Sequence, residues 1–240
     1  MALRSSIEWT QSTWNPVTGC SKVSPGCLHC YAERLSYRLK RMGNARYASG
    51  FRVTLHDDLL QLPSRWREPR LVFVNSMSDL FHEAIPFEFI QSVFSTIQAT
   101  PWHTFQVLTK RATRLAEVAA KLPWPDNLWI GVSVEKQDYV WRADCLRSLP
   151  TLVRFISCEP LLGSIKLPLQ DIRWVIAGGE SGPEARQMDL DWARSLRDQC
   201  LAAGVPFFLK QLGGAVDKRG REQAILDGRL WREMPRNHSR

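Results

Sequence analysis

The sequence predicts an α/β protein built on a mostly parallel β-sheet that helices cover on both faces. Short apolar, β-branched or aromatic runs recur along the chain, amphipathic helical stretches fill most of the intervals, and each run ends in polar residues. Near-continuous apolar strands that alternate with helices are typical of a parallel sheet buried on both faces. We expect a partial or nearly closed (β/α) barrel first and an open doubly wound sheet second, because 240 residues suffice for one barrel.

Six apolar runs have the length and composition of buried strands. They are residues 71–74, 105–108, 128–132, 153–156, 174–177 and 206–209. Residues 8–10 or 51–54 could supply further strands.

Helices are expected where apolar residues recur with a period close to 3.6. These stretches are residues 86–99, 111–122, 137–149 and 189–203, the last followed by Gly204 as a stop. A further helix is expected to begin near Tyr31 and run towards Met42. Between residues 159 and 171 no helical pattern is visible, so this crossover is expected to be irregular.

The composition bounds the class of protein. With 44% apolar residues the chain can bury a core. No uninterrupted apolar stretch reaches 18 residues, so no membrane span is expected. The first ten residues lack the apolar core of a signal peptide, so we expect a cytoplasmic protein.

The net charge of +8 favours an anionic partner, most commonly DNA or RNA. Basic residues gather in two regions with aromatic residues between them that could stack on bases, although a solvated surface explains such runs equally well. The basic residues are Arg34, Arg38, Lys40, Arg41, Arg46, Arg52, Lys218, Arg219, Arg221, Arg229, Arg232, Arg236 and Arg240. The aromatic residues are Tyr37, Tyr47, Phe51, Trp66 and Trp231.

Three of the six cysteines lie within eleven residues, as Cys20, Cys27 and Cys30 with the spacing C-x6-C-x2-C. Glycine and proline in this loop allow the tight turns that three converging sulfurs need. The last two cysteines precede the helix expected near Tyr31, whose partly positive N-terminus favours thiolate. In a reducing compartment such a cluster points to metal binding.

Three thiolates without a local fourth ligand indicate an iron–sulfur site. A structural zinc site uses four closed ligands, and the chain has no second cysteine pair. A [4Fe–4S] cluster with three cysteine ligands leaves one iron open, as enzymes that cleave S-adenosylmethionine to a radical require. Zinc completed by a distant residue, and redox or structural thiols, remain alternatives. Cys158 could be a fourth ligand, whereas Cys145 and Cys200 fit apolar helix faces.

The polar residues that follow the expected strands form a candidate site. In a (β/α) barrel the carboxyl ends of the strands build the active site. A charged side chain next to a buried strand costs desolvation unless it faces a polar cavity. The residues are Ser76, Asp79, Lys110, Ser133, Glu135, Glu159, Glu180 and Lys210. A barrel hydrolase with Glu159 and Glu180 as paired carboxylates is a rival interpretation.

Several motifs taken in order carry a family resemblance. They are IEWTQSTWNPVTGCSKVSPGCLHCYAERL, VNSMSDLFHEAIP, VLTKR, LWIGVSVE, FISCEPLLG, WVIAGGESG and PFFLKQLGG. Together they resemble the phage-associated three-Cys-motif family, a radical-SAM-like group of mostly unknown function. The resemblance covers residues 7 to about 214 and implies a radical-SAM-type barrel over residues 1–214, with a basic tail over residues 215–240.

The resemblance also implies roles for individual residues. Cys20, Cys27 and Cys30 would hold a [4Fe–4S] cluster, and S-adenosylmethionine would be the second cofactor. Its adenine would meet His29, its methionine amino group Ser76 and Asp79, and its ribose or carboxylate Ser133 and Glu135. The substrate would be held near Lys110, Glu159, Glu180 and Lys210.

The expected reaction is radical chemistry on a nucleic acid or nucleotide, for modification or repair. The electron donor would be a flavodoxin or ferredoxin, and a partner protein encoded nearby is also allowed. The alternative is a non-enzymatic iron–sulfur or zinc protein that binds nucleic acid.

Overall fold

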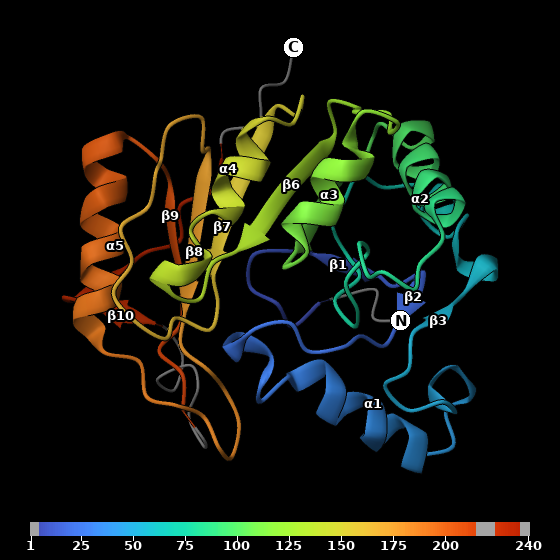
Figure 1. Ribbon diagram of the computed structural model, residues 1–240, viewed down its shortest axis with the longest axis horizontal. Helices are drawn as coiled ribbons and strands as arrows, with labels where there is room; N and C mark the ends of the chain where they lie inside the picture. The colour runs from blue at the N-terminus through green and yellow to red at the C-terminus, as the bar shows by residue number, and fades with distance from the viewer. Residues whose placement is uncertain (1–4, 215–223, 236–240) are drawn as a thin grey trace. The chain divides into compact units, whose positions relative to one another are not determined.

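The computed structural model describes residues 5–214 and 224–235 (Figure 1). Its main feature is a seven-stranded sheet with the order β1-β4-β5-β6-β7-β8-β9. The strands are β1 (Ser12–Trp14), β4 (Leu71–Val74), β5 (Thr104–Thr109), β6 (Leu128–Ser133), β7 (Val153–Cys158), β8 (Trp174–Gly178) and β9 (Phe207–Gln211). The described pairings β1·β4, β4·β5, β7·β8 and β8·β9 are parallel.

The strand order identifies the type of α/β fold. Each strand of this sheet lies beside the strand of the same sheet that follows it in the sequence, so the strand order never turns back across the sheet. A doubly wound sheet needs such a reversal, whereas a (β/α) barrel does not. The order has two ends, β1 and β9, so among the described residues the sheet is open. The expected partial barrel is confirmed, and the doubly wound alternative is wrong.

The six strands expected from apolar runs are all present, but the two further candidates need correction. The seventh strand is β1, which begins two residues after the stretch 8–10. Thr10 is held in a turn instead, where its amide donates to the Ile7 carbonyl. Only the end of the stretch 51–54 is extended. There, β3 (Thr54–Leu55) pairs antiparallel with β2 (Val17–Thr18), outside the main sheet.

The helices largely follow the expected pattern. They are α1 (Tyr31–Arg41), α2 (Phe87–Ala99), α3 (Ala112–Ala119), α4 (Arg142–Arg147) and α5 (Leu190–Ala203), with short 3₁₀ turns at 25–27, 45–47, 57–59, 63–65 and 137–139. The helix expected over 137–149 is thus shorter than predicted, because the amides of Val140 and Ala143 bond three residues back rather than four. Residues 159–171 contain no helix, as expected. No described helix has the length and apolar character needed to cross a membrane.

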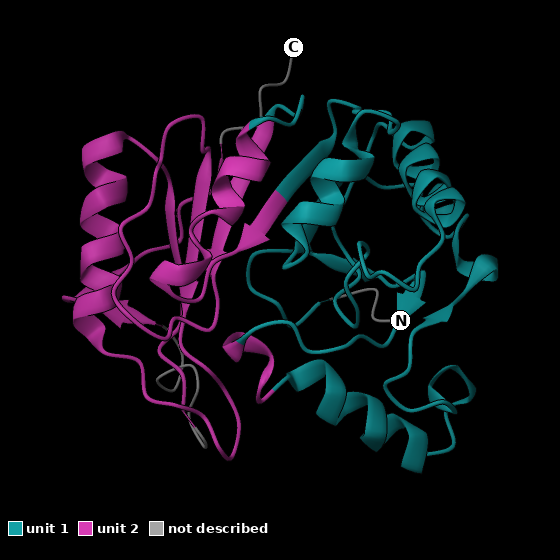
Figure 2. Ribbon diagram, in the orientation of Figure 1, with its two compact units in different colours: residues 1–24, 30–130, 148–152 teal, residues 25–29, 131–147, 153–240 magenta. Residues whose placement is uncertain are grey.

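The chain divides into two compact units, shown in different colours in Figure 2. Unit 1 comprises residues 1–24, 30–130 and 148–152, and unit 2 comprises residues 25–29, 131–147 and 153–240. Unit 1 packs α2 and the buried faces of β1, β4 and β5 around aromatic side chains. Trp14 is fully buried, meets the Phe105 ring edge-on, and donates its indole N–H to the Leu59 carbonyl at 2.8 Å.

The core of unit 2 is a row of aromatic rings on β7, β8 and β9. Phe155 packs on Trp174, which meets Phe208 edge-on. The row needs a glycine on β6, because a Cβ atom at Gly131 would lie 2.4 Å from the Phe155 ring.

Part of the segment expected as a basic tail is folded. Within it, β10 (Ile225–Leu226) and β11 (Arg229–Leu230) form an antiparallel hairpin. Trp231 is buried against Phe207, and the Trp231 carbonyl accepts from the Leu209 amide at 2.8 Å. The remaining basic residues of this segment, Lys218, Arg219, Arg221, Arg236 and Arg240, lie outside the described residues.

Candidate functional site

The three-cysteine loop begins at a glycine and ends at a helix. Gly19 has a φ of +84°, and a Cβ atom there would lie 2.2 Å from the Arg52 carbonyl oxygen, so only glycine fits. Cys27 closes a 3₁₀ turn, and Cys30 is the N-cap residue of α1. The expected helix start immediately after the last cysteine is confirmed.

Two of the three thiols lie on one apolar surface in unit 1. Cys20 and Cys30 pack against a buried cluster formed by Ala32, Tyr47, Phe51 and Met77. Cys27 belongs to unit 2. In the described parts of the chain, no three His, Cys, Asp or Glu side chains are already gathered as a metal site. The donor set nevertheless fits an iron–sulfur group, since thiols with an apolar surround are its usual ligands.

Burial, together with the nearby Asp79 carboxylate, raises the pKa of the Cys20 thiol to about 11, against the opposing effect of Arg111. Without a metal, Cys20 is therefore protonated at neutral pH. A metal that bound this thiol would take it up as thiolate and release its proton.

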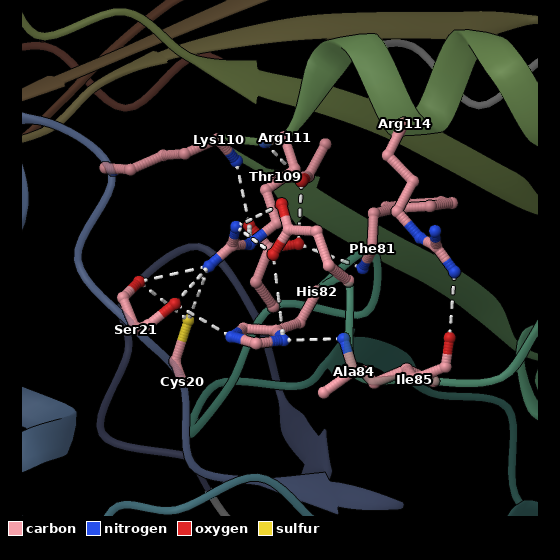
Figure 3. A network of polar contacts seen from close by, with 12 residues as sticks. Cys20, Ser21, Phe81, His82, Ala84, Ile85, Thr109, Lys110, Arg111 and Arg114 are labelled. Atoms are coloured by element: carbon pink, nitrogen blue, oxygen red, sulfur yellow. Dashed lines mark hydrogen bonds and ion pairs between the residues drawn. The ribbon is translucent and has the colours of Figure 1, made fainter.

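Arg111 is the main polar partner of the first cysteine (Figure 3). Its Nη2 donates to the carbonyl of Ser21 at 3.1 Å and to Ser21 Oγ at 2.9 Å, and it lies 3.9 Å from Cys20 Sγ. Its Nη1 donates to the Glu83 carboxylate at 2.5 Å. Ser21 Oγ is also 2.8 Å from His82 Nε2. A guanidinium beside this thiol lowers the cost of holding negative charge there.

Asp79, predicted to meet the methionine amino group, is buried and accepts three hydrogen bonds. Its donors are Thr109 Oγ1 at 2.7 Å and the amides of Lys110 and Phe81, each at 3.0 Å. The carboxylate thus joins the segment after β4 to the end of β5. Its expected neighbour Ser76 donates to Asn15 Oδ1 at 3.1 Å. The cofactor roles of Asp79 and Ser76 stay predictions.

Unit 2 carries a buried ion pair at the end of β6. Arg142 Nη1 donates to Glu135 Oε2 at 2.9 Å and to the Ser133 carbonyl at 2.8 Å. The two charged side chains are only 2% and 0% exposed. Arg142 also lies over the Tyr139 ring, 4.3 Å from its centroid. The two residues predicted to meet the ribose or carboxylate of S-adenosylmethionine, Ser133 and Glu135, therefore share one arginine partner.

The next two strands provide the second charged pair. Lys210 Nζ on β9 donates to Glu159 Oε2, just after β7, at 3.0 Å. Gly178 on the intervening β8 lies beside this pair, since a Cβ atom there would be in van der Waals contact with Glu159, at 3.4 Å from Oε1. Two residues predicted to hold substrate thus lie together, partly exposed at 16% and 20%.

The third pair holds the turn that contains Cys27. Arg186 donates from Nε and its amide to Glu180 Oε2, at 2.8 and 2.9 Å, and from Nη2 to Glu180 Oε1 at 2.5 Å. The same Nη2 donates to the Pro25 carbonyl at 2.9 Å. These contacts hold the pKa of Glu180 below its usual range, against the opposing effect of burial.

Two further contacts of unit 2 involve the same turn. A Cβ atom on Gly26 would lie 3.2 Å from the Glu135 carboxylate, so the turn packs closely on that side chain. His29, predicted to meet the adenine, has its Nδ1 3.2 Å from the exposed Glu184 carboxylate. Acidic and basic side chains that follow two strands, β6 and β8, therefore lie against this turn.

Sequence reasoning missed the three arginines that organise these contacts, Arg111, Arg142 and Arg186. Arg111 could have been noticed, because it follows Lys110 directly at the end of an expected strand. Arg142 and Arg186 lie six or seven residues from the glutamates they bind, in stretches without a distinguishing pattern. Lys110 belongs to unit 1 and the other three residues predicted to hold substrate belong to unit 2.

Comparison with known proteins gives one family match. A model for a family described as "Protein of unknown function (DUF5131)" matches residues 4–235. No curated protein matches the chain.

Among solved structures, a mutant spore photoproduct lyase with bound AdoMet and dinucleoside spore photoproduct is similar, with a TM-score of 0.45 and 13% identity over 78% of this chain. The same lyase complexed with dinucleoside spore photoproduct has a TM-score of 0.42 and 12% identity over 76% of this chain. The chain spans 60% and 58% of the length of these two structures.

Proposed function

The chain belongs to the DUF5131 family, and on that premise we propose that it is an iron–sulfur enzyme of radical-SAM type. The observation that carries this proposal is the three-cysteine loop, in which Cys20 and Cys30 pack on one apolar cluster and Cys30 opens a helix. Three thiols in one short loop suit a cluster that keeps one iron open for S-adenosylmethionine.

The bound cluster would supply the electron that cleaves S-adenosylmethionine into methionine and a 5′-deoxyadenosyl radical. The protein's part is to bind and to orient. We assign the ligand role to Cys20, Cys27 and Cys30, with Arg111 offsetting thiolate charge beside Cys20. Cys158 is a poor fourth ligand, because it is fully buried at the end of β7.

The roles proposed for contacts with the cofactor are those that the family resemblance implies. His29, Ser76, Asp79, Ser133 and Glu135 would contact S-adenosylmethionine. Substrate would lie near Lys110, Glu159, Glu180 and Lys210, among which the Glu159–Lys210 pair offers both an acceptor and a donor. The contacts of Glu180 with Arg186 favour a positioning role for Glu180 over direct contact with substrate.

The substrate class that we propose is a nucleic acid or a nucleotide. The support is electrostatic, since the net charge of +8 attracts polyanions. A reaction on DNA or RNA, such as modification or repair, would use the radical to remove a hydrogen atom from the bound nucleotide.

Anaerobic purification and reconstitution with iron and sulfide test this function. We expect about four irons per chain, as a cubane cluster requires, and formation of 5′-deoxyadenosine from S-adenosylmethionine with dithionite. Cys20→Ala should abolish both. Cys145→Ala is the matched control, because Cys145 lies on α4 away from the loop in sequence, and it should keep both.

Three results would contradict the proposal. A colourless chain with one zinc would indicate a structural metal module. A stable cluster without 5′-deoxyadenosine formation would indicate a non-enzymatic iron–sulfur protein. Loss of the cluster in Cys158→Ala, with an unchanged unfolding transition, would show a fourth protein ligand and remove the open iron.

A further inference from the structure

Large apolar side chains are exposed next to the cysteine loop. In the described part of unit 1, five of the seven exposed large apolar residues fall between residues 23 and 42. They are Val23, Tyr31, Leu35, Tyr37 and Met42, with exposed fractions of 38–69%. Scattered exposed apolar residues are normal, but their concentration on one helix and on the segment that precedes it marks an interaction surface.

Helix α1 touches its own unit through a narrow stripe. Ala32 and Ser36 are buried and Leu39 is half-buried, at the spacing i, i+4, i+7. Leu35 and Met42 are on the outer side with basic residues between them, so the helix exposes a mixed apolar and basic face. We call this the α1 face, and it consists of Tyr31, Arg34, Leu35, Tyr37, Arg38, Lys40, Arg41 and Met42.

The charge of the α1 face is one-sided. Its basic residues Arg34, Arg38, Lys40 and Arg41 are all exposed. The acidic residue of this helix, Glu33, is 3.1 Å from Lys22 Nζ and is thereby neutralised. The face therefore presents an apolar surface bordered by positive charge, a composition rich in Tyr, Met and Arg like that of protein interfaces.

A nucleic acid fits this face less well. Stacking on bases needs exposed aromatic rings. Tyr47 and Phe51 are only 9% exposed, because they belong to the apolar cluster against which Cys20 and Cys30 pack. Tyr31 and Tyr37 of the face are exposed, but the Tyr31 hydroxyl donates to the Ser76 carbonyl, which ties that ring to its own unit. Leu35 and Met42 of the face are exposed and not aromatic, and they suit protein side chains better than bases.

We propose that the α1 face docks an acidic electron-carrier protein, an inference that rests on the function proposed above. The face lies at the cysteine loop, since Cys30 is the N-cap residue of α1 and Ala32 of α1 belongs to the apolar cluster that holds Cys20. One electron would leave the reduced flavin or iron–sulfur centre of the carrier and enter the centre at the loop. Positive charge around an apolar contact speeds the encounter with an acidic partner.

The test compares two electron sources in one reconstituted enzyme. Arg34→Glu/Arg38→Glu reverses two charges on the face, and Leu35→Ser removes apolar contact. With reduced flavodoxin, we expect the KM for the carrier to rise at least about tenfold in the charge variant and to become less sensitive to salt. With dithionite, which needs no docking surface, formation of 5′-deoxyadenosine should stay within about twofold.

The matched control is Arg65→Glu/Arg67→Glu, two exposed arginines of the same unit outside the face. It should leave the KM for flavodoxin unchanged. Equal KM values for wild type and both α1 variants would overturn the proposal. So would loss of binding to a labelled single-stranded oligonucleotide in the α1 variants with unchanged flavodoxin kinetics, since the face would then serve nucleic acid.

Failure of the proposed function can be told apart from failure of the docking surface. A chain that takes up no iron contradicts the proposed enzyme function. Calorimetric titration of the protein with oxidised flavodoxin measures docking by itself, without any reaction. Binding that weakens with salt and is lost in Arg34→Glu/Arg38→Glu supports the surface. Absence of binding in the wild type at low salt overturns it.

Discussion

Arg186 binds both carboxylate oxygens of Glu180 and, through the same guanidinium, the carbonyl of Pro25. A two-point ion pair of this kind fixes the plane of the guanidinium. The remaining N–H is thus directed at the turn that ends in Cys27. Arg111 connects the beginning of the loop to unit 1 in a similar way. Its Nη1 donates to the Glu83 carboxylate and its Nη2 donates to the Ser21 carbonyl.

We predict that Arg186→Met loosens the turn without unfolding the chain. In the reconstituted protein, iron should be released to a chelator about tenfold faster than from wild type, because positioning contacts around a metal site commonly contribute 10–100-fold in affinity. The rate of iron release from Arg186→Lys should be intermediate, since a lysine ammonium can reach Glu180 or Pro25 but cannot bind both in the fixed geometry of a guanidinium.

Arg173→Met is the control for the arginine change, because Arg173 is exposed in the same unit. Circular dichroism should show equal folding of all three variants. Equal iron release from Arg186→Met and wild type would show that the contact does not stabilise the site.

A second prediction concerns Asp79, whose buried carboxylate accepts three hydrogen bonds. Asp79→Ala leaves the Thr109 hydroxyl and two amides without an acceptor, so urea unfolding should show a loss of about 1–3 kcal/mol or more. Asp126→Ala, at an exposed position of the same unit, should change stability by less than about 0.5 kcal/mol. A stable Asp79→Ala with lost cofactor binding would instead favour direct contact with S-adenosylmethionine.

The buried Arg142–Glu135 pair gives a third prediction. Arg142→Met should destabilise the protein by about 3–5 kcal/mol, because it leaves a buried carboxylate uncompensated. Arg142→Met/Glu135→Leu removes both charges and should recover most of that loss. A double variant no more stable than the single one in urea unfolding would mean that the arginine acts mainly by packing on Tyr139.

The fourth prediction is a pH dependence that comes from Cys200. Burial raises the pKa of this thiol to about 12, and Glu233 contributes in the same direction. The unfolded thiol ionises near its ordinary value of about 8.5, so the stabilising contribution is complete below that pH and is lost as the pH rises towards 12.

Urea unfolding of metal-free wild type and Cys200→Ala, from about pH 8 to about pH 10.5, measures this contribution. The stability advantage of wild type should shrink as the pH rises. The difference between the two proteins cancels the titration of tyrosine and lysine. A constant or growing difference would show that the thiol is not protected from ionisation.

The sequence by itself determined six of the seven strands of the main sheet and the position of the cysteine loop, whereas the strand order came from the structure. Buried parallel strands need apolar side chains on both faces, so residues 71–74 and 174–177 could be recognised from composition alone. The spacing of Cys20, Cys27 and Cys30 likewise indicated a loop that ends at a helix. These features depend on neighbours in the chain, which a single sequence displays.

The tertiary structure decided which charged residues are partners and which surfaces are exposed. Arg111 meets Ser21 across ninety residues, and Lys210 on β9 meets Glu159 after β7, fifty-one residues earlier in the chain. Tyr47 and Phe51 read as exposed aromatics in a basic stretch, yet they are buried under the cysteines. Such pairings arise from the packing of distant segments, so local patterns of polarity cannot reveal them.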